Sequence, residues 1–189
     1  LSDDGLCRSF GKGASGYVPG EGSAAVLLKP LASAAADGDH IYGVIKASAL
    51  NHNGNGNGYA VPNPVAQANV MKEALERSGL APKDISCIEA QAVGSKLGDS
   101  IEMRSLNIAY KGEELSKTCS VGSVKSNIGH LEPASGMASL AKVLLQLEHK
   151  TLVPSIHSED ENEDIDFSVT RFKVQKKTER WTVPNGSRR

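Results

Sequence analysis

Hydrophobic and polar positions along the chain fall into short blocks with either helical or strand-like spacing. Residues 65–78 have the clearest amphipathic helical pattern, and Gly79 follows as a C-cap residue. A second helix is predicted at 137–147, where apolar residues surround most of the helix, a pattern typical of burial on more than one side. A third helix is predicted to begin with the capping-box-like sequence Asp99-Ser100-Ile101-Glu102 and to end near Tyr110. The apolar stripe of the first helix consists of Val65, Ala68, Met71, Leu75 and Ser78.

Short apolar runs between these helices have the length of strands. Between Pro30 and Gly38, an alanine-rich stretch predicts one further brief helix. Strands and helices therefore alternate, which predicts an α/β layered fold with at least partly parallel strand pairing. The predicted strands span 24–28, 41–50, 85–90, 119–121 and 152–153.

The connecting segments are rich in glycine or in charged residues. Residues 1–22 contain five glycines from Gly11 onward and form a loop that is either ordered or disordered. Three consecutive Asn-Gly pairs predict tight turns within 51–58, and this segment lacks the spacing of a phosphate-binding loop. Further loops are expected at 91–98, 111–117, 122–130 and 158–166.

The overall composition excludes several functional classes. The 189 residues carry a formal net charge of -1, so no basic field attracts nucleic acid or anionic lipid. The apolar runs are too short to cross a membrane, and the first residues lack the features of a signal peptide. Three cysteines without C-x-x-C spacing predict neither a disulfide framework nor a metal site, so we expect a reducing, cytoplasmic setting.

The histidines differ in what their surroundings indicate. His40, His149 and His157 occupy connecting segments or a helix end, where a structural or surface role is expected. His130 ends the loop Gly122-Ser123-Val124-Lys125-Ser126-Asn127-Ile128-Gly129-His130, just after a predicted strand. Loops at strand ends commonly hold catalytic groups, but the pattern fits a hydrogen-bonded structural histidine equally well.

Four longer motifs connect the chain to a known family. They are GYVPGEGSAAVLLKPL, DGDHIYGVIKASALNHNGNGNGYAVPNP, SVGSVKSNIGHLEPASGMASLAKVLLQL and LVPSIHSE. Together they resemble the ketosynthase (beta-ketoacyl synthase) domain of modular polyketide synthases, most closely the trans-acyltransferase type. The resemblance runs over residues 1–189 and is most specific in the segment that ends in His130.

The resemblance implies a thiolase-like α/β/α/β/α fold, of which this chain would form the C-terminal portion. Residues 1–60 would end the N-terminal half of the domain, and residues 61–189 would form most of its C-terminal half. Domains of this family are usually homodimers. They take acyl chains from the phosphopantetheine arm of an acyl carrier protein, with no permanently bound cofactor, and condense them with a malonyl thioester. Fatty acid biosynthesis uses related enzymes.

The family's active site resembles a Cys-His-His set. Its nucleophilic cysteine belongs upstream of Leu1, and none of the three cysteines here stands in that motif. The second histidine matches His130, and the lysine that supports it matches Lys125. The first histidine should begin His-Gly-Thr-Gly-Thr, where this sequence has Gln91-Ala92-Val93-Gly94-Ser95. Ser95 would then take the place of a threonine that contacts the phosphopantetheine arm.

The glutamine at position 91 bears directly on the expected activity. A histidine there can donate a hydrogen bond to the enolate oxygen and move protons, whereas an amide cannot act as an acid or base near neutral pH. The favoured hypothesis is a non-elongating ketosynthase, an acyltransferase that passes on an acyl chain without condensation. One alternative is an active condensing enzyme in which Gln91 substitutes for histidine. Another is a non-catalytic scaffold or carrier-docking module.

Overall fold

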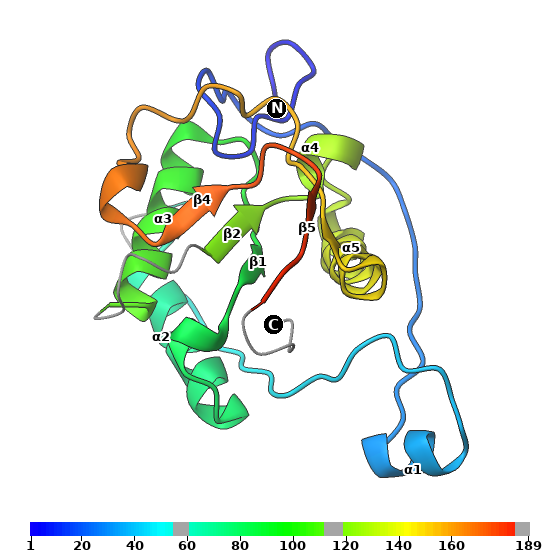
Figure 1. Ribbon diagram of the computed structural model, residues 1–189. Helices are drawn as coiled ribbons and strands as arrows, with labels where there is room; N and C mark the ends of the chain where they lie inside the picture. Colours follow the sequence, from blue (N-terminus) through cyan, green and yellow to red (C-terminus); the bar gives the residue numbers. More distant parts are fainter. Residues whose placement is uncertain (55–60, 112–118, 184–189) are drawn as a thin grey trace.

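A small parallel sheet with helices on both of its faces forms the centre of the molecule (Figure 1). The computed structural model describes residues 1–54, 61–111 and 119–183. Strand β2 (Cys119–Gly122) lies between β1 (Cys87–Glu89) and β4 (Phe172–Val174), and both neighbours run parallel to it. The parallel pairing and the α/β layering confirm the predicted fold class.

Two helices cover one face of this sheet and a third covers the other. Helices α2 (Pro64–Ser78) and α3 (Lys96–Ala109) pack together on the first face, and α5 (Ser135–His149) lies on the opposite side (Figure 1). Strands β3 (Thr151–Leu152) and β5 (Glu179–Arg180) form a separate antiparallel pair. The short helices are α1 (Leu31–Ala36), α4 (Lys125–Ile128), η1 (Pro82–Asp84), η2 (Glu132–Ala134) and η3 (Phe167–Val169).

Local sequence determines both ends of α2, of which the Gly79 end was predicted. The Asn63 side chain accepts hydrogen bonds from the backbone N–H groups of Val65 and Ala66, which are unpaired at a helix start. Gly79 ends the helix in the left-handed conformation with φ of 67°. The predicted brief helix between Pro30 and Gly38 is likewise confirmed as α1.

Helix α3 begins earlier than predicted. Its N-cap is Ser95, whose hydroxyl accepts a hydrogen bond from Gly98 N at 3.2 Å, so the predicted start at Asp99 is wrong. A serine cap four residues upstream satisfies one of the N–H groups that a helix start leaves unpaired. Asp99 and Glu102 are therefore available for other contacts, which are described with the site.

The strands predicted at 24–28 and 41–50 are absent. Both segments are extended and largely exposed, and Leu27 is 95% exposed. A strand requires hydrogen bonds to a neighbouring strand, and no other described segment pairs with either one. The runs 55–60 and 112–118 lie outside the described residues, so the second half of the Asn-Gly loop and nearly all of the predicted 111–117 link are not described.

Three further expectations need correction. The predicted loop at 122–130 contains one turn of helix, α4. Helix α5 is less enclosed than predicted: the segment at Gly43 lies against Leu144 and Leu147, but a further apolar side is uncovered in the described residues. That side lines an open groove of about 580 Å³ with Ala138, Ala141 and Leu145. Strand β4 was not predicted, because its three residues are too few to show a repeated alternation of buried and exposed side chains. Phe172 and Val174 are buried, and Lys173 between them is exposed.

The hydrophobic core lies between the sheet and helices α2 and α3. Ala68 of α2 and Met103 of α3 are buried there beside Val121 of β2. Phe10, from the glycine-rich first segment, is also fully buried in this core. Residues 1–22 are therefore an ordered loop, which packs through Phe10 on the core between the sheet and helices α2 and α3. None of the helices in the described residues is long and apolar enough to span a bilayer.

Truncation of Phe10 tests whether the first segment is part of this core. In the complete domain, Phe10→Ala is expected to lower the free energy of unfolding by about 3–5 kcal/mol, because it leaves a cavity. Val169→Ala removes an apolar side chain that is 65% exposed and should change stability by less than about 0.5 kcal/mol. Urea denaturation measures both, and equal losses would contradict the assignment.

Candidate active site

The carboxyl ends of β1 and β2 bring two of the predicted site residues together. Gln91 follows β1 by two residues, and His130 follows β2 through the single turn of α4. Because the two strands are parallel neighbours, these loops leave the sheet at the same edge. The Gln91 Nε2 and His130 Nε2 atoms lie 3.4 Å apart, although 39 residues separate them in the chain.

The backbone fixes the tautomer of His130. Its Nδ1 atom accepts a hydrogen bond from the Glu132 backbone N–H at 2.9 Å. A ring nitrogen that accepts carries no proton, so the neutral ring holds its proton on Nε2, the atom that faces Gln91. Burial and, second, the Lys125 charge lower the pKa of His130 below its usual value, which favours this neutral form.

Two donors therefore face each other across the gap. The Nε2–H of His130 and the amide N–H₂ of Gln91 cannot bond to one another, so a direct bond requires the Gln91 oxygen to turn toward the ring. With the amide nitrogen facing inward, both groups are hydrogen-bond donors that lie side by side. Two neighbouring donors suit a negatively charged oxygen, as in an oxyanion hole.

Lys125 lies in α4, in the same loop as His130. Its residue is only 1% exposed, and burial lowers the pKa of its ammonium group while the nearby Glu89 and Glu102 carboxylates oppose that shift. The charge of Lys125 acts on His130 through space. The structure thus gathers three of the predicted residues, Gln91, Lys125 and His130, into one region.

Glu102 of α3 holds the backbone at the glutamine position. One of its oxygens accepts from Gln91 N at 2.8 Å, and the other accepts from Ala92 N at 2.7 Å. This clamp acts on the main chain, so it does not depend on which side chain stands at position 91. Burial nevertheless raises the pKa of the Glu102 carboxyl, against the effect of these two bonds.

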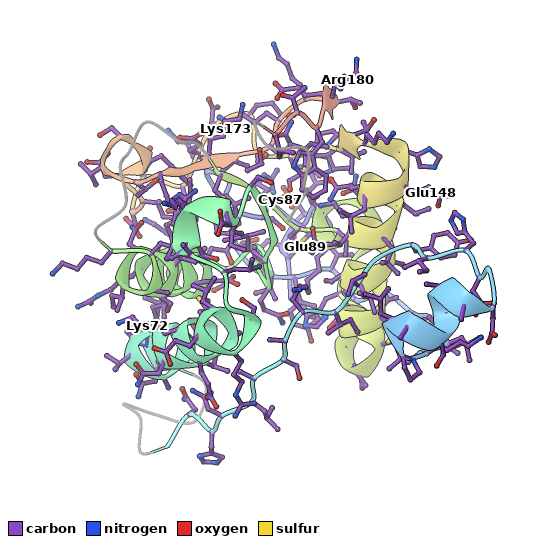
Figure 2. All side chains as sticks on the ribbon, turned by 60° about the horizontal axis from the view of Figure 1, so that its bottom comes forward. Lys72, Cys87, Glu89, Glu148, Lys173 and Arg180 are labelled. Carbon is purple, nitrogen blue, oxygen red and sulfur yellow. The ribbon has the colours of Figure 1, made fainter. Side chains whose placement is uncertain are left out.

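Glu89, the last residue of β1, supports the loop that carries Lys125. Its Oε1 atom accepts from Val124 N at 2.6 Å, and its Oε2 atom pairs with Lys142 Nζ of α5 at 2.7 Å. The two side chains are 5% and 8% exposed. Figure 2 shows Glu89 in the interior beside α5, whereas the labelled Lys72 and Lys173 lie at the periphery. The pair joins the sheet, the site loop and α5.

Asp99 forms a third contact of the same kind. Its carboxylate accepts hydrogen bonds from Phe10 N at 2.8 Å and Ser95 N at 3.3 Å, and so ties the first segment to the start of α3. Burial raises the pKa of Asp99 to about 7, with a smaller contribution from the Glu102 charge.

Sequence reasoning missed the function of all three acids. A signal did exist in the helix, because Asp99 and Glu102 stand three residues apart near the buried positions Met103 and Leu106. The acid that ends the short strand β1, Glu89, was a second signal.

Ser95 lies at the far end of the loop that begins with Gln91. Its hydroxyl oxygen accepts the capping hydrogen bond, a role that does not use the O–H hydrogen. Gly94 beside it has φ of 77°, and a Cβ there would lie 2.9 Å from Arg8 N, so glycine is required at this motif position.

The three cysteines are free, and burial dominates the behaviour of each. Desolvation raises the pKa of Cys87 to about 11 and that of Cys119 to about 12, and it also raises the pKa of Cys7. Thiols of this kind are poor nucleophiles near neutral pH. Among the described residues, no group of histidine, cysteine or acidic side chains could hold a metal ion.

Comparison with known proteins identifies the family. Residues 42–159 match the model "Beta-ketoacyl synthase, C-terminal domain", and residues 1–34 match "Beta-ketoacyl synthase, N-terminal domain". The chain is 52% identical over 185 residues to the polyketide synthase PksL of Bacillus subtilis, covering 97% of this chain and 4% of PksL. It is 51% identical over 191 residues to the polyketide synthase ThaG of Burkholderia thailandensis, covering 100% and 3%.

Solved structures agree with this result. The oxazolomycin ketosynthase domain OzmH KS7 of Streptomyces albus superposes with a TM-score of 0.94 at 51% identity, over 96% of this chain and 32% of that one. The ketosynthase from module 6 of the bacillaene synthase of Bacillus subtilis gives 0.95 at 41% identity, over 98% and 34%. The chain belongs to the beta-ketoacyl synthase family, as part of a polyketide synthase ketosynthase domain with the thiolase-like fold. It spans about a third of the length of these solved ketosynthase chains.

Removal of Lys142 tests the buried pair. In the complete domain, Lys142→Met leaves the Glu89 carboxylate without its partner and is expected to cost about 3–5 kcal/mol of stability. Glu89→Gln combined with Lys142→Met keeps an acceptor for Val124 N and removes both charges, so it should regain most of that loss. Lys173→Met, on a half-exposed side chain, is the control, with less than about 1 kcal/mol expected. A single-variant loss as small as the control's would exclude a structural role for the pair.

The raised pKa of Asp99 predicts part of the pH dependence of stability. Between its usual value of 3.8 and its folded value of about 7, the folded protein retains a proton that the unfolded chain has lost. The stability contributed at low pH is therefore lost as pH rises through this window. Asp99→Asn should lack this component, whereas Asp164→Asn, on an exposed side chain, should keep it. The measurement is the free energy of unfolding as a function of pH across this window. Parallel curves for Asp99→Asn and the unaltered protein would refute the raised pKa of Asp99.

Proposed function

We propose that this chain is part of a non-elongating ketosynthase of a trans-acyltransferase polyketide synthase. In this role the domain accepts an acyl chain from one acyl carrier protein and passes it to another without decarboxylative condensation. The observation that carries the proposal is the side chain opposite His130. The position where the family has a catalytic histidine holds Gln91, an amide that cannot take up or release a proton near neutral pH.

The two half-reactions make different demands on this position. In acyl transfer, a cysteine thiolate of the complete domain attacks the thioester carbonyl, a new C–S bond forms, and the carrier thiol leaves. That step depends on the thiolate and on an oxyanion hole made largely by backbone N–H groups. It does not require a proton-transferring group at position 91.

Condensation requires more from the site. Malonyl thioester loses carbon dioxide, the resulting enolate attacks the acyl-enzyme carbonyl, and the cysteine thiolate leaves. Loss of a general acid or base in such a step costs about 10²- to 10⁴-fold in rate. Gln91 keeps a hydrogen-bond donor but has no such proton-transfer capacity, so elongation is expected to be slow relative to acyl transfer.

One observation favours a second candidate, an active condensing enzyme. The Gln91 Nε2 and His130 Nε2 atoms lie 3.4 Å apart, and two neighbouring donors are a suitable arrangement for an enolate oxygen. If charge stabilisation alone limits the rate, Gln91 substitutes for the histidine. Carrier protein, acyl thioester and a second copy of the domain are the partners expected under either proposal. Contact between Ser95 and the phosphopantetheine arm is also part of both.

Intact-protein mass spectrometry of the complete domain tests the proposal. The domain is loaded from an acyl-carrier thioester, and malonyl-carrier protein is then added. We expect an acyl adduct that is not elongated by the unaltered domain, and at least about 10²-fold faster elongation in Gln91→His. Gln91→Asn keeps an amide at the same position and should remain unable to elongate, so it controls for general effects of substitution.

The other outcomes point to the alternatives. Prompt elongation by the unaltered domain would establish Gln91 as a working replacement for histidine. Failure to form any acyl adduct, with the domain folded, would leave a scaffold or carrier-docking module as the explanation.

A further inference from the structure

The segment 17–20 runs beside His130 and holds its main chain on both sides. His130 N donates to Val18 O at 2.7 Å, and Gly20 N donates to His130 O at 3.0 Å, which forms a parallel bridge. Gly129, the residue before the histidine, has φ of 77°, and a Cβ there would lie 2.8 Å from Val18 O. The first segment and the site loop therefore approach each other as closely as their backbones allow.

Side chains close a second set of contacts around the imidazole. The Tyr17 and His130 rings meet edge to face, with centroids 5.3 Å apart and planes at 67°. The Tyr17 hydroxyl donates to Glu132 Oε1 at 3.2 Å. Glu132 in turn donates its backbone N–H to His130 Nδ1 at 2.9 Å. Tyr17 thus contacts the ring directly and also holds the residue that determines which ring nitrogen carries the proton.

The backbone of Glu132 indicates that this arrangement is imposed. Its φ of 47° is in the left-handed region, which residues other than glycine rarely adopt and which persists only when surrounding contacts hold it. The same residue donates its backbone N–H to His130 Nδ1. The carboxylate of the same residue is the group that Tyr17 holds.

We propose that Tyr17 and Glu132 are positioning residues that form a latch, and that the latch holds His130 as its Nε2–H tautomer facing Gln91. The latch connects the glycine-rich first segment to the ring through one hydrogen bond and one edge-to-face contact. It rests on the proposed function only in that the Nε2–H serves as a donor to the substrate oxygen. The latch acts through His130 and does not itself contact the reacting atoms.

Histidine side-chain ¹⁵N NMR of the complete domain reads the tautomer directly. His130→Ala assigns the His130 signals. In the unaltered protein we expect one bare and one protonated nitrogen, the signature of a single neutral tautomer. In Tyr17→Phe, which keeps the ring and removes the hydroxyl, the two resonances should move toward each other. In Glu132→Ala, which removes the carboxylate, the same convergence is expected to be larger.

The chain contains a matched control on its surface. His40 meets the Tyr42 ring edge to face at 4.4 Å and lies 3.5 Å from Glu148, the α5 residue labelled in Figure 2. Tyr42→Phe makes the same chemical change in a similar cluster away from the site. It should leave the His130 resonances unchanged, and an equal shift there would show a general effect of the substitution and overturn the latch.

The result for the latch is independent of the elongation experiment. Unchanged His130 tautomer signals in both Tyr17→Phe and Glu132→Ala, with unchanged thermal midpoints, would overturn the proposal. If the unaltered domain elongates promptly, the non-elongating function fails while the tautomer signature still decides the latch. Glu132→Gln, which keeps an acceptor for the Tyr17 hydroxyl, should retain the single-tautomer signature, and its loss would show that the charge rather than the hydrogen bond is responsible.

Discussion

The site depends on buried carboxylates that accept hydrogen bonds from the main chain. Glu102 holds the segment after β1, Glu89 holds the start of α4, and Asp99 joins the first segment to α3. Each accepts from backbone N–H groups that no strand or helix satisfies, and an unsatisfied buried group of this kind is costly. Burial raises the pKa of all three acids, because a buried carboxylate loses its hydration. Holding the loops in this way therefore carries a desolvation cost.

These anchors explain how irregular loops place side chains reproducibly. Two parallel strands deliver Gln91 and His130 to one edge of the sheet, and the carboxylates then fix the main chain around each of them. The glycine-rich first segment adds a second wall, because its residues bridge to His130 and its Phe10 fills the core. The positions of the Gln91 and His130 side chains therefore depend on main-chain contacts that other residues make.

Local patterns in the sequence predicted the elements that local forces determine. The periodicity of 65–78 and its Gly79 cap are confirmed, as are the strands near 87 and 119. Residues 24–28 and 41–50 show the limit, since strand formation depends on a partner strand that their own pattern cannot specify. Motifs located Gln91, Lys125 and His130, but Glu89 and Glu102 escaped notice because the value of a buried acid depends on tertiary neighbours.

The Glu102 clamp has a consequence for how this family diversifies. Since it grips the main-chain N–H groups of Gln91 and Ala92, the side chain at position 91 can be exchanged while the loop stays in place. Glutamine and histidine codons differ only at the third base. One nucleotide change can therefore add or remove an ionisable ring without disturbing the fold. A single point mutation converts glutamine to histidine at this position, and a second point mutation reverses the change.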